Sequence, residues 1–202
     1  MTLEDYGLIH RASRGDVEAF AKLVRRHSDL VYRVALRILG PEEAKDASQE
    51  VWVRVWRALD SFRAESAFTT WVYKITVNTC LSELRRERGR AERERDRYHE
   101  IVSLLEEPRA GDDPEAAALG RERMDEAIRC LQRLRPDHRA ALVLRHLEGL
   151  SYPEISEVLE VPEGTAKGWV SRGRTALLVM LSQNGEEDGA PSNPESERGG
   201  EP

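Results

Sequence analysis

The amino-acid sequence predicts an all-α protein made of two small helical domains that are joined by a flexible acidic linker. Apolar residues recur every three or four positions through residues 1–97 and 121–181, as on the buried face of a helix, and no stretch alternates like a strand. Residues 98–120 mix proline, glycine and acidic residues without sustained periodicity, which is typical of a linker. Residues 182–202 contain few apolar residues, so we expect a disordered acidic tail.

The composition indicates a polar chain without a metal or cofactor site. The chain has 202 residues, of which 34% are charged, and no apolar run approaches the roughly 20 residues of a membrane span. The N-terminus lacks a basic segment followed by an apolar one, so we expect no signal peptide. Cys80 and Cys130 form no paired motif, and no spacing of His and Cys suggests metal ligands. We therefore expect no cofactor, no metal, no membrane segment and a cytoplasmic location.

The net charge of −6 at pH 7 is unevenly distributed along the chain. The two helical segments carry net charges of +3 (residues 1–97) and +1 (residues 121–181), whereas the linker and the tail carry −5 each. The acidity thus lies in the segments that we expect to be unstructured. A nucleic-acid partner for the helical segments is compatible with the acidic total.

Helix signals follow one another through the first domain. Asp16 could cap the first helix. Its apolar positions are Phe20, Leu23 and Val24. A second helix carries one apolar stripe, formed by Leu30, Val31, Val34, Ala35, Ile38 and Leu39. Gly40 and Pro41 then interrupt the pattern, and Pro41 suits the first turn of a third helix that ends at about Leu59.

A loop with the sequence DSFRAES separates this third helix from a long one, which is predicted to begin at about Phe68. Apolar residues lie nearly all round the long helix. One side carries Phe68, Trp71, Val72 and Ile75, and another carries Val77, Leu81 and Leu84. The remaining narrow polar stripe is formed by Lys74, Asn78, Ser82 and Arg85.

The second domain contains two short helices with a tight break between them, at about residues 152–171. Ser151 followed by Glu154 is a capping-box pattern that starts the first of the two, and Thr165 opens the second. The second helix carries the basic residues Lys167, Arg172 and Arg174. This arrangement lets the second helix of a helix-turn-helix enter the major groove of DNA. Two helices that only pack together would give the same pattern.

Four segments occur in this order around the acidic linker: GDVEAFAKLVRRH, DASQEVWVRVWRALDSFR, SAFTTWVYKITVNT and LRPDHRAALVLRHLEGLSYPEISEVLEVPEGTAKGWVSRGRTAL. Together they resemble the extracytoplasmic-function (ECF) sigma factors of bacterial RNA polymerase, over about residues 6–97 and 121–181. The resemblance implies two helical domains, called sigma-2 and sigma-4, on a flexible tether. No segment matches the sigma-1.1 or sigma-3 regions, and this places the resemblance with the ECF group.

The resemblance implies that the segment DASQEVWVRVWRAL binds core RNA polymerase, at the clamp of its largest subunit. The expected contact residues are Asp46, Gln49, Glu50, Trp52 and Trp56. The first three match the family's D-x-x-Q-E pattern, and their spacing of i, i+3 and i+4 places them on one helix face. The two tryptophans lie one turn apart on a neighbouring strip, where they could anchor the interface or belong to the core.

The resemblance also implies that the segment SFRAESAFTTWVYKITVN reads the promoter −10 element and opens the duplex. Holding unstacked bases requires a pocket, aromatic surfaces and amide edges beside cations. The expected contact residues are Phe62, Arg63, Ser66, Phe68, Trp71, Tyr73, Lys74, Asn78 and Arg85. The rings of Phe68 and Trp71 could also pack in the core. Ala64 stands where the family often has Gly, which bears on the shape of the loop.

Sigma-4 is implied to read the −35 element through the second helix of the pair. The expected contact residues are Thr165, Lys167, Trp169, Ser171, Arg172 and Arg174. The N-terminus of this helix could also hold a phosphate. Gly168 and Trp169 stand where Ser and Arg are usual, and Glu160 stands where Gly is frequent in the turn.

The sequence therefore predicts a dissociable subunit for transcription initiation, and not an enzyme. The implied partners are core RNA polymerase (the clamp of the largest subunit and the flap of the second-largest), promoter DNA in double- and single-stranded form, and an anti-sigma factor. A stand-alone helix-turn-helix regulator is one alternative, but it would need neither the D-x-x-Q-E face nor the aromatic loop. An enzyme is the other, and no catalytic constellation supports it, because the histidines are scattered. They are His10, His27, His99, His138 and His146.

Overall fold

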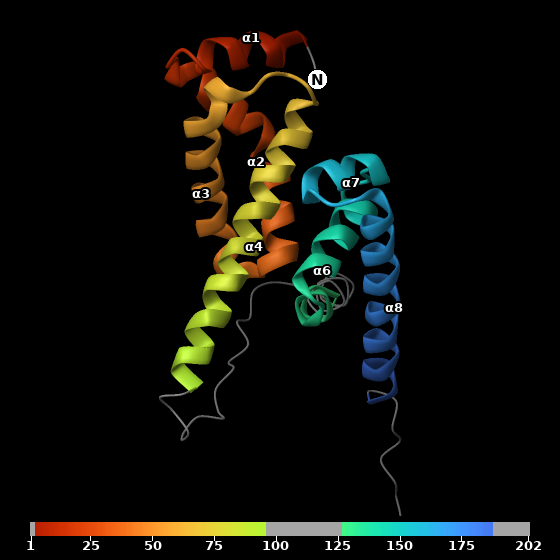
Figure 1. The fold of residues 1–202 in the computed structure, drawn as a ribbon. Helices are drawn as coiled ribbons and strands as arrows, with labels where there is room; N and C mark the ends of the chain where they lie inside the picture. Colours follow the sequence, from red (N-terminus) through yellow and green to blue (C-terminus); the bar gives the residue numbers. More distant parts are fainter. Residues whose placement is uncertain (1–2, 96–126, 188–202) are drawn as a thin grey trace, which may run out of the picture.

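The computed structural model describes residues 3–95 and 127–187, and these consist of packed helices (Figure 1). As the sequence predicts, no strand occurs within the described ranges. The helices are α1 (Leu3–Ala12), α2 (Val17–Leu39), α3 (Pro41–Ala58), the short η1 (Leu59–Ser61), α4 (Phe68–Arg95), α6 (Pro136–Leu142), the π-helical turn η2 (Val143–Leu147), α7 (Tyr152–Leu159) and α8 (Glu163–Glu187). Residues 127–133 are also helical. None of these described helices is long and apolar enough to cross a membrane.

Helices α1 to α4 form the first helical unit. Helices α2, α3 and α4 lie side by side, and α1 lies across one end of them (Figure 1). The fully buried side chains at their centre are Leu23, Val31, Val51, Val55, Leu59, Phe68 and Val72. Two predicted helix starts are confirmed: the Asp16 carboxylate accepts a hydrogen bond from the amide of Ala19, and Pro41 occupies the first turn of α3.

Two features of this unit differ from the prediction. The two helices expected between residues 17 and 39 are one continuous helix, α2, because the polar residues 25–29 interrupt the apolar stripe but include no Gly or Pro. The apolar pattern also does not single out helix α1. This helix is held partly by a tertiary contact, in which the buried carboxylate of Asp5 pairs with Arg26 of α2.

The second helical unit comprises residues 127–133, α6, η2, α7 and α8. The predicted capping box is confirmed, since the Ser151 hydroxyl accepts from the Glu154 amide while the Glu154 carboxylate accepts from the Ser151 amide. Helix α8 begins at Glu163, two residues before the predicted start. It continues to Glu187, so the predicted tail (residues 182–202) begins inside it. The predicted linker, residues 98–120, lies outside the described residues.

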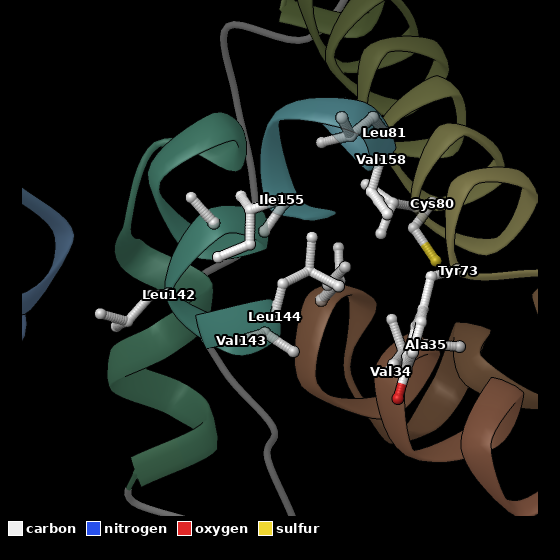
Figure 2. Close-up of a cluster of buried hydrophobic side chains, with 14 of the residues drawn as sticks. Val34, Ala35, Tyr73, Cys80, Leu81, Leu142, Val143, Leu144, Ile155 and Val158 are labelled. Carbon is white, nitrogen blue, oxygen red and sulfur yellow. The ribbon is translucent and has the colours of Figure 1, made fainter. Parts of the chain in front are cut away.

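The two units share one hydrophobic core. Figure 2 shows side chains of α2 and α4, such as Val34 and Cys80, facing Leu144 of η2 and Val158 of α7. This explains why α4 is apolar nearly all round. One of its sides packs within the first unit, and the other side packs against the second unit. That second side carries Tyr73, Val77, Cys80, Leu81 and Leu84.

Candidate nucleic-acid and protein interfaces

The outward face of α3 presents the predicted polymerase-binding residues to solvent. Asp46, Gln49 and Glu50 are all exposed, because Ala44, Ala47, Val51 and Val55 occupy the buried side of the same helix. Asp46 and Glu50 line an open hollow of about 550 Å³ between α3 and α4. Glu50 is held in place by Arg54, one turn later, at 2.7 Å. The face is therefore polar and accessible.

The two tryptophans of α3 extend this face toward α2. The ring of Phe20 packs edge-on against Trp52 and Trp56, with ring centroids 6.1 and 4.7 Å apart. Trp52 is half-buried, Trp56 is 36% exposed and Val53 beside them is 42% exposed. Each ring is thus packed on one side and open on the other, and the role of the tryptophans in polymerase binding stays a prediction.

The loop before α4 and the first turns of α4 enclose a small hollow of about 210 Å³. Five of the predicted −10 residues line it: Phe62, Arg63, Ser66, Trp71 and Lys74. The rings of Phe62, Phe68 and Trp71 pack together, with centroids 5.2–5.8 Å apart. Phe68 is only 1% exposed, so it supports the other two rings from below instead of lining the hollow.

The other predicted −10 residues lie on different sides of α4. Asn78 and Arg85 are exposed farther along the helix, on the same face as Trp71 and Lys74. Tyr73 points the opposite way, into the contact with the second unit, and is 8% exposed. Its hydroxyl donates to the Glu148 carboxylate at 2.9 Å. Burial, followed by the charge of Glu148, raises the pKa of Tyr73, so this phenol stays protonated.

Two positions where the family often has Gly adopt the left-handed backbone that Gly favours. Ala64, in the loop of the −10 hollow, has φ of 56°, and Glu160, at the end of α7, has φ of 54°. Each non-Gly residue in this conformation costs about 1–2 kcal/mol. The loop and the turn therefore keep a glycine-like backbone path although the side chains differ.

The N-terminal half of α8 carries the predicted −35 residues. Lys167, Ser171, Arg172 and Arg174 are exposed, because Ala166 and Val170 face the core. The Lys167 ammonium pairs with Glu163 at 2.7 Å. Thr165 is half-buried in the first turn. Trp169 is half-buried and packs against the shared core, so only part of its ring is available to DNA.

Arg172 lies close to the surface of its own helix and to His138. A Cβ atom at Gly168 would lie 3.2 Å from the Arg172 guanidinium. The Arg172 Nε lies 3.5 Å from His138 Nε2. Burial first, and then the charges of Arg172 and Arg135, lower the pKa of His138. His138 is thus neutral at pH 7. Its ring adds no charge beside the positive charge of Arg172.

Sequence reasoning missed the polar residues that join the two units. Glu148, after η2, accepts from Arg33 and Arg37 of α2 as well as from Tyr73. Arg139 of α6 donates to the carbonyl of Ile38 at the end of α2. The second apolar side of α4 is the signal that could have revealed this contact. The helices predicted for the first domain left that side without a partner.

Comparison with known proteins identifies the two units. The family model described as Sigma-70 region 2 matches residues 23–90, and the model described as Sigma-70, region 4 matches residues 124–177. The chain is 36% identical over 182 residues to the RNA polymerase sigma-H factor of Pseudomonas aeruginosa, across 88% of this chain and 94% of that relative. It is 34% identical over 181 residues to the ECF RNA polymerase sigma-E factor of Escherichia coli (strain K12), across 87% and 93% of the two chains.

Solved structures agree with these matches. CnrH, solved in complex with the cytosolic domain of CnrY, is 26% identical and gives a TM-score of 0.61 across 90% of this chain and 99% of that chain. The sigma factor RpoE of Bartonella quintana, solved in complex with the anti-sigma factor NepR, gives a TM-score of 0.62 at 24% identity, across 82% and 98%. The second comparison supports the fold, and the sequence relatives support the family. The chain belongs to the ECF sigma factors of bacterial RNA polymerase.

Proposed function

We propose that this sigma factor binds core RNA polymerase through the outward face of α3 and reads a promoter through two separate surfaces. The single observation that carries the proposal is the hollow beside α4, where the carboxylates of Glu65 and Glu157 also lie and where aromatic rings, two hydroxyls and two cations converge. These are the groups that hold single-stranded bases. A stand-alone helix-turn-helix regulator, the alternative weighed from the sequence, has no use for such a hollow.

In the proposed −10 complex, an unstacked base enters the hollow and rests against the half-buried rings of Phe62 and Trp71. Arg63 and Lys74 at the rim neutralise the neighbouring phosphates. Stacking on aromatic rings contributes about 1–3 kcal/mol per base, which is comparable to the few kcal/mol that unstacking costs. Asn78 and Arg85 continue along the same face of α4 and would follow the strand. No step of this melting needs a catalytic residue.

In the proposed −35 complex, the N-terminal half of α8 lies in the major groove. Arg172 and Arg174 supply the planar donors that recognise guanine edges or phosphates, and Lys167 and Ser171 are placed one turn apart beside them. The Arg172 guanidinium lies over Gly168, and the partly available ring of Trp169 is suited to an apolar contact with a thymine methyl group. The −35 preference should therefore differ from that of relatives with Ser and Arg at these positions.

The partners proposed for the chain follow from these surfaces. Core polymerase would hold sigma-2 at the clamp of the largest subunit and sigma-4 at the flap of the second-largest. Two surfaces that each bind DNA weakly would then bind one promoter with a higher overall affinity. An anti-sigma factor is proposed as the antagonist, in line with the complexes in which the similar sigma factors were solved. All of these events would take place in the cytoplasm, where the polymerase works.

A polymerase-binding experiment separates the α3 face from the DNA surfaces. The triple variant D46A/Q49A/E50A should bind core polymerase at least about 30-fold more weakly, the loss that truncating one hot-spot residue can produce. The helix should survive, because all three side chains are exposed. The affinity can be measured by fluorescence anisotropy of labelled full-length chain, and the helical content by circular dichroism.

The control is the double variant S171A/R172A, which alters exposed residues of α8. It should keep full affinity for core polymerase and lose transcription from promoters that depend on the −35 element. If instead the triple variant bound polymerase as tightly as the wild-type chain, the α3 face would not be the docking surface. If the α8 variant lost polymerase binding, the division of roles would be wrong.

A further inference from the structure

Arg172, a predicted −35 residue on α8, makes two contacts within sigma-4 that restrict its side chain. Its Nε atom lies 3.5 Å from Nε2 of His138, a half-buried residue of α6. Its guanidinium lies over Gly168, one turn earlier on α8, where an added Cβ would be 3.2 Å from both terminal nitrogens. An exposed arginine ordinarily samples many rotamers. The two contacts together favour one orientation of the planar group.

The close approach of α6 to α8 places the His138 ring beside Arg172. The two helices lie side by side (Figure 1). Gly173 of α8 is buried, and an added Cβ there would lie 3.0 Å from the backbone oxygen of His138. A side chain at this position would push the two helices apart. Pro136 fixes the first turn of α6 two residues before His138. The imidazole therefore has a defined position relative to α8.

His138 can accept a hydrogen bond from Arg172 only while its ring is neutral. A neutral imidazole has one nitrogen with a free lone pair, whereas both nitrogens of the protonated ring are donors. The charged groups that face the ring are Arg172 of α8, Arg135 at the start of α6 and Asp137 within α6. Burial first, and then the two arginines, lower the pKa of His138 from its ordinary value of 6.5, while Asp137 opposes them. Acid would therefore turn this acceptor into a cation beside another cation.

The contact with His138 uses the Nε–H of Arg172 and leaves its two terminal nitrogens for another partner. Among the described residues these two nitrogens have no hydrogen-bond acceptor. A guanidinium carries its five N–H donors in a fixed fork, and a pair of them matches N7 and O6 of a guanine in the major groove. Because Nε is already engaged, the pair that remains is the one formed by the terminal nitrogens. His138 thus leaves Arg172 one way of making two bonds to a base.

Gly168 weakens α8 and gains no packing in return. Gly is a poorer helix former than Ala. The three atoms nearest to an added Cβ at this position all belong to the Arg172 guanidinium. A residue that breaks a local rule without a gain in packing is expected at a functional site. The missing side chain of Gly168 therefore provides the place in which the guanidinium lies.

We propose that His138 and Gly168 are positioning residues for recognition of the −35 element. They hold the Arg172 guanidinium in one orientation, in which its terminal nitrogens read a guanine, and recognition of that base pair weakens in acid. This inference rests on the proposed function, in which the N-terminal half of α8 lies in the major groove. It adds two residues that act through Arg172 and need no contact with DNA themselves.

Holoenzyme assembled from core RNA polymerase and the full-length chain provides the test. Selection of bound duplexes from a library randomised across the −35 element gives the base preference at each position, for the wild-type chain and for R172A. The position whose preference R172A loses is the base pair that Arg172 reads, and we expect G·C there. Discrimination is then the ratio of holoenzyme affinities for the selected duplex and for the same duplex with that base pair replaced by A·T, measured by fluorescence anisotropy.

Both positioning residues should affect this one base pair. H138A should lower the discrimination about three- to tenfold, the effect of immobilising one rotamer-rich side chain on binding, while preferences at the other positions stay unchanged. G168A should lower it at the same position although the helix becomes more stable, a combination that a merely structural role would not give. H138A/R172A should lose no more than R172A alone, because His138 acts through Arg172.

The pH profile separates the hydrogen bond of His138 from its packing. Wild-type discrimination should be constant above pH 6.5 and should fall as the pH drops toward about 5, because protonation removes the acceptor. H138Q should keep its discrimination over the whole range, since the amide oxygen accepts a hydrogen bond and does not titrate. The control is H10Q, which removes an exposed imidazole of α1 and should leave the wild-type profile unchanged.

The variants distinguish failure of this inference from failure of the proposed function. If R172A lost no base preference, the proposed role of α8 would fail and the inference with it. If R172A lost one preference while H138A and G168A kept it, Arg172 would read DNA unaided, and only the inference would fail. A uniform loss of affinity in H138A would show a structural role. Tighter binding of every duplex in acid at constant discrimination would show a phosphate contact by His138, and either result would overturn the proposal.

Discussion

His27 is a buried imidazole that connects three helices of sigma-2. It lies on α2, its Nε2 is 3.8 Å from the Asp5 carboxylate of α1, and its ring packs edge-on against Phe68 of α4 at 5.3 Å between centroids. Burial lowers the pKa of His27, with Asp5 opposing this effect and Arg26 adding to it. The folded chain therefore holds a neutral imidazole that the unfolded chain would protonate near pH 6.5.

This difference predicts a loss of stability in mild acid. Because the pKa of His27 is depressed in the folded state, its contribution is complete above about pH 6.5 and is lost as the pH falls below that value, by at most about 1.4 kcal/mol per pH unit. In urea unfolding at pH 7.5 and 5.5, the H27Q variant should lose less stability between the two pH values than the wild-type chain. Equal losses would exclude His27 as the source. His138, whose pKa is also lowered, should leave a smaller residual slope.

At the scale of single residues, the sequence predicted most of the −10 hollow but not the direction of every side chain. Phe62, Arg63, Ser66, Trp71 and Lys74 meet as the resemblance implies. Tyr73 does not join them, because a residue two positions after Trp71 on a helix points to nearly the opposite side. The burial of that side depends on sigma-4, which is distant in sequence, so a local pattern cannot reveal it.

Among the elements, α8 contains two glycines in different surroundings. Gly168 is half-buried, and an added Cβ there would meet only the flexible end of Arg172. Gly173 is buried, and an added Cβ would lie 3.0 Å from the backbone oxygen of His138. The first glycine therefore weakens the helix without a packing reason, and the second allows α6 and α8 to approach closely.

The two glycines should respond in opposite ways to alanine. G168A should raise the free energy of unfolding by up to about 1 kcal/mol, because Gly is that much poorer than Ala inside a helix. G173A should lower it by about 1–3 kcal/mol, because the α6 backbone must shift to make room. Urea unfolding of the full-length chain measures both. A change of the same sign in the two variants would contradict this account of the helix.

Helix boundaries were predictable where a capping signal marks them. Asp16, Pro41 and Ser151 each act at a helix start as predicted. The errors arose where a local pattern was ambiguous. Polar residues 25–29 suggested a break in α2 that does not exist, and α8 runs past the predicted boundary at residue 181. Helix α1 is held partly by the pairing of the buried Asp5 carboxylate with Arg26, which periodicity does not detect.

At the scale of the whole molecule, one chain carries three surfaces with separate proposed roles. In the proposed function, the outward face of α3 docks on polymerase, the hollow beside α4 holds an unstacked base, and α8 reads duplex DNA. In the proposed complex, polymerase holds both DNA-reading surfaces on one promoter at the same time. Neither DNA reader needs high affinity of its own.

The measurement that tests the central claim most directly is transcription from a randomised promoter library by core RNA polymerase with and without this chain. We expect the chain to enable transcripts whose templates share two enriched sequence blocks, one near −10 and one near −35, and core polymerase alone to yield neither block. Transcription that gained no promoter preference from the chain would contradict the account. A single block bound equally well without polymerase would instead identify a stand-alone regulator.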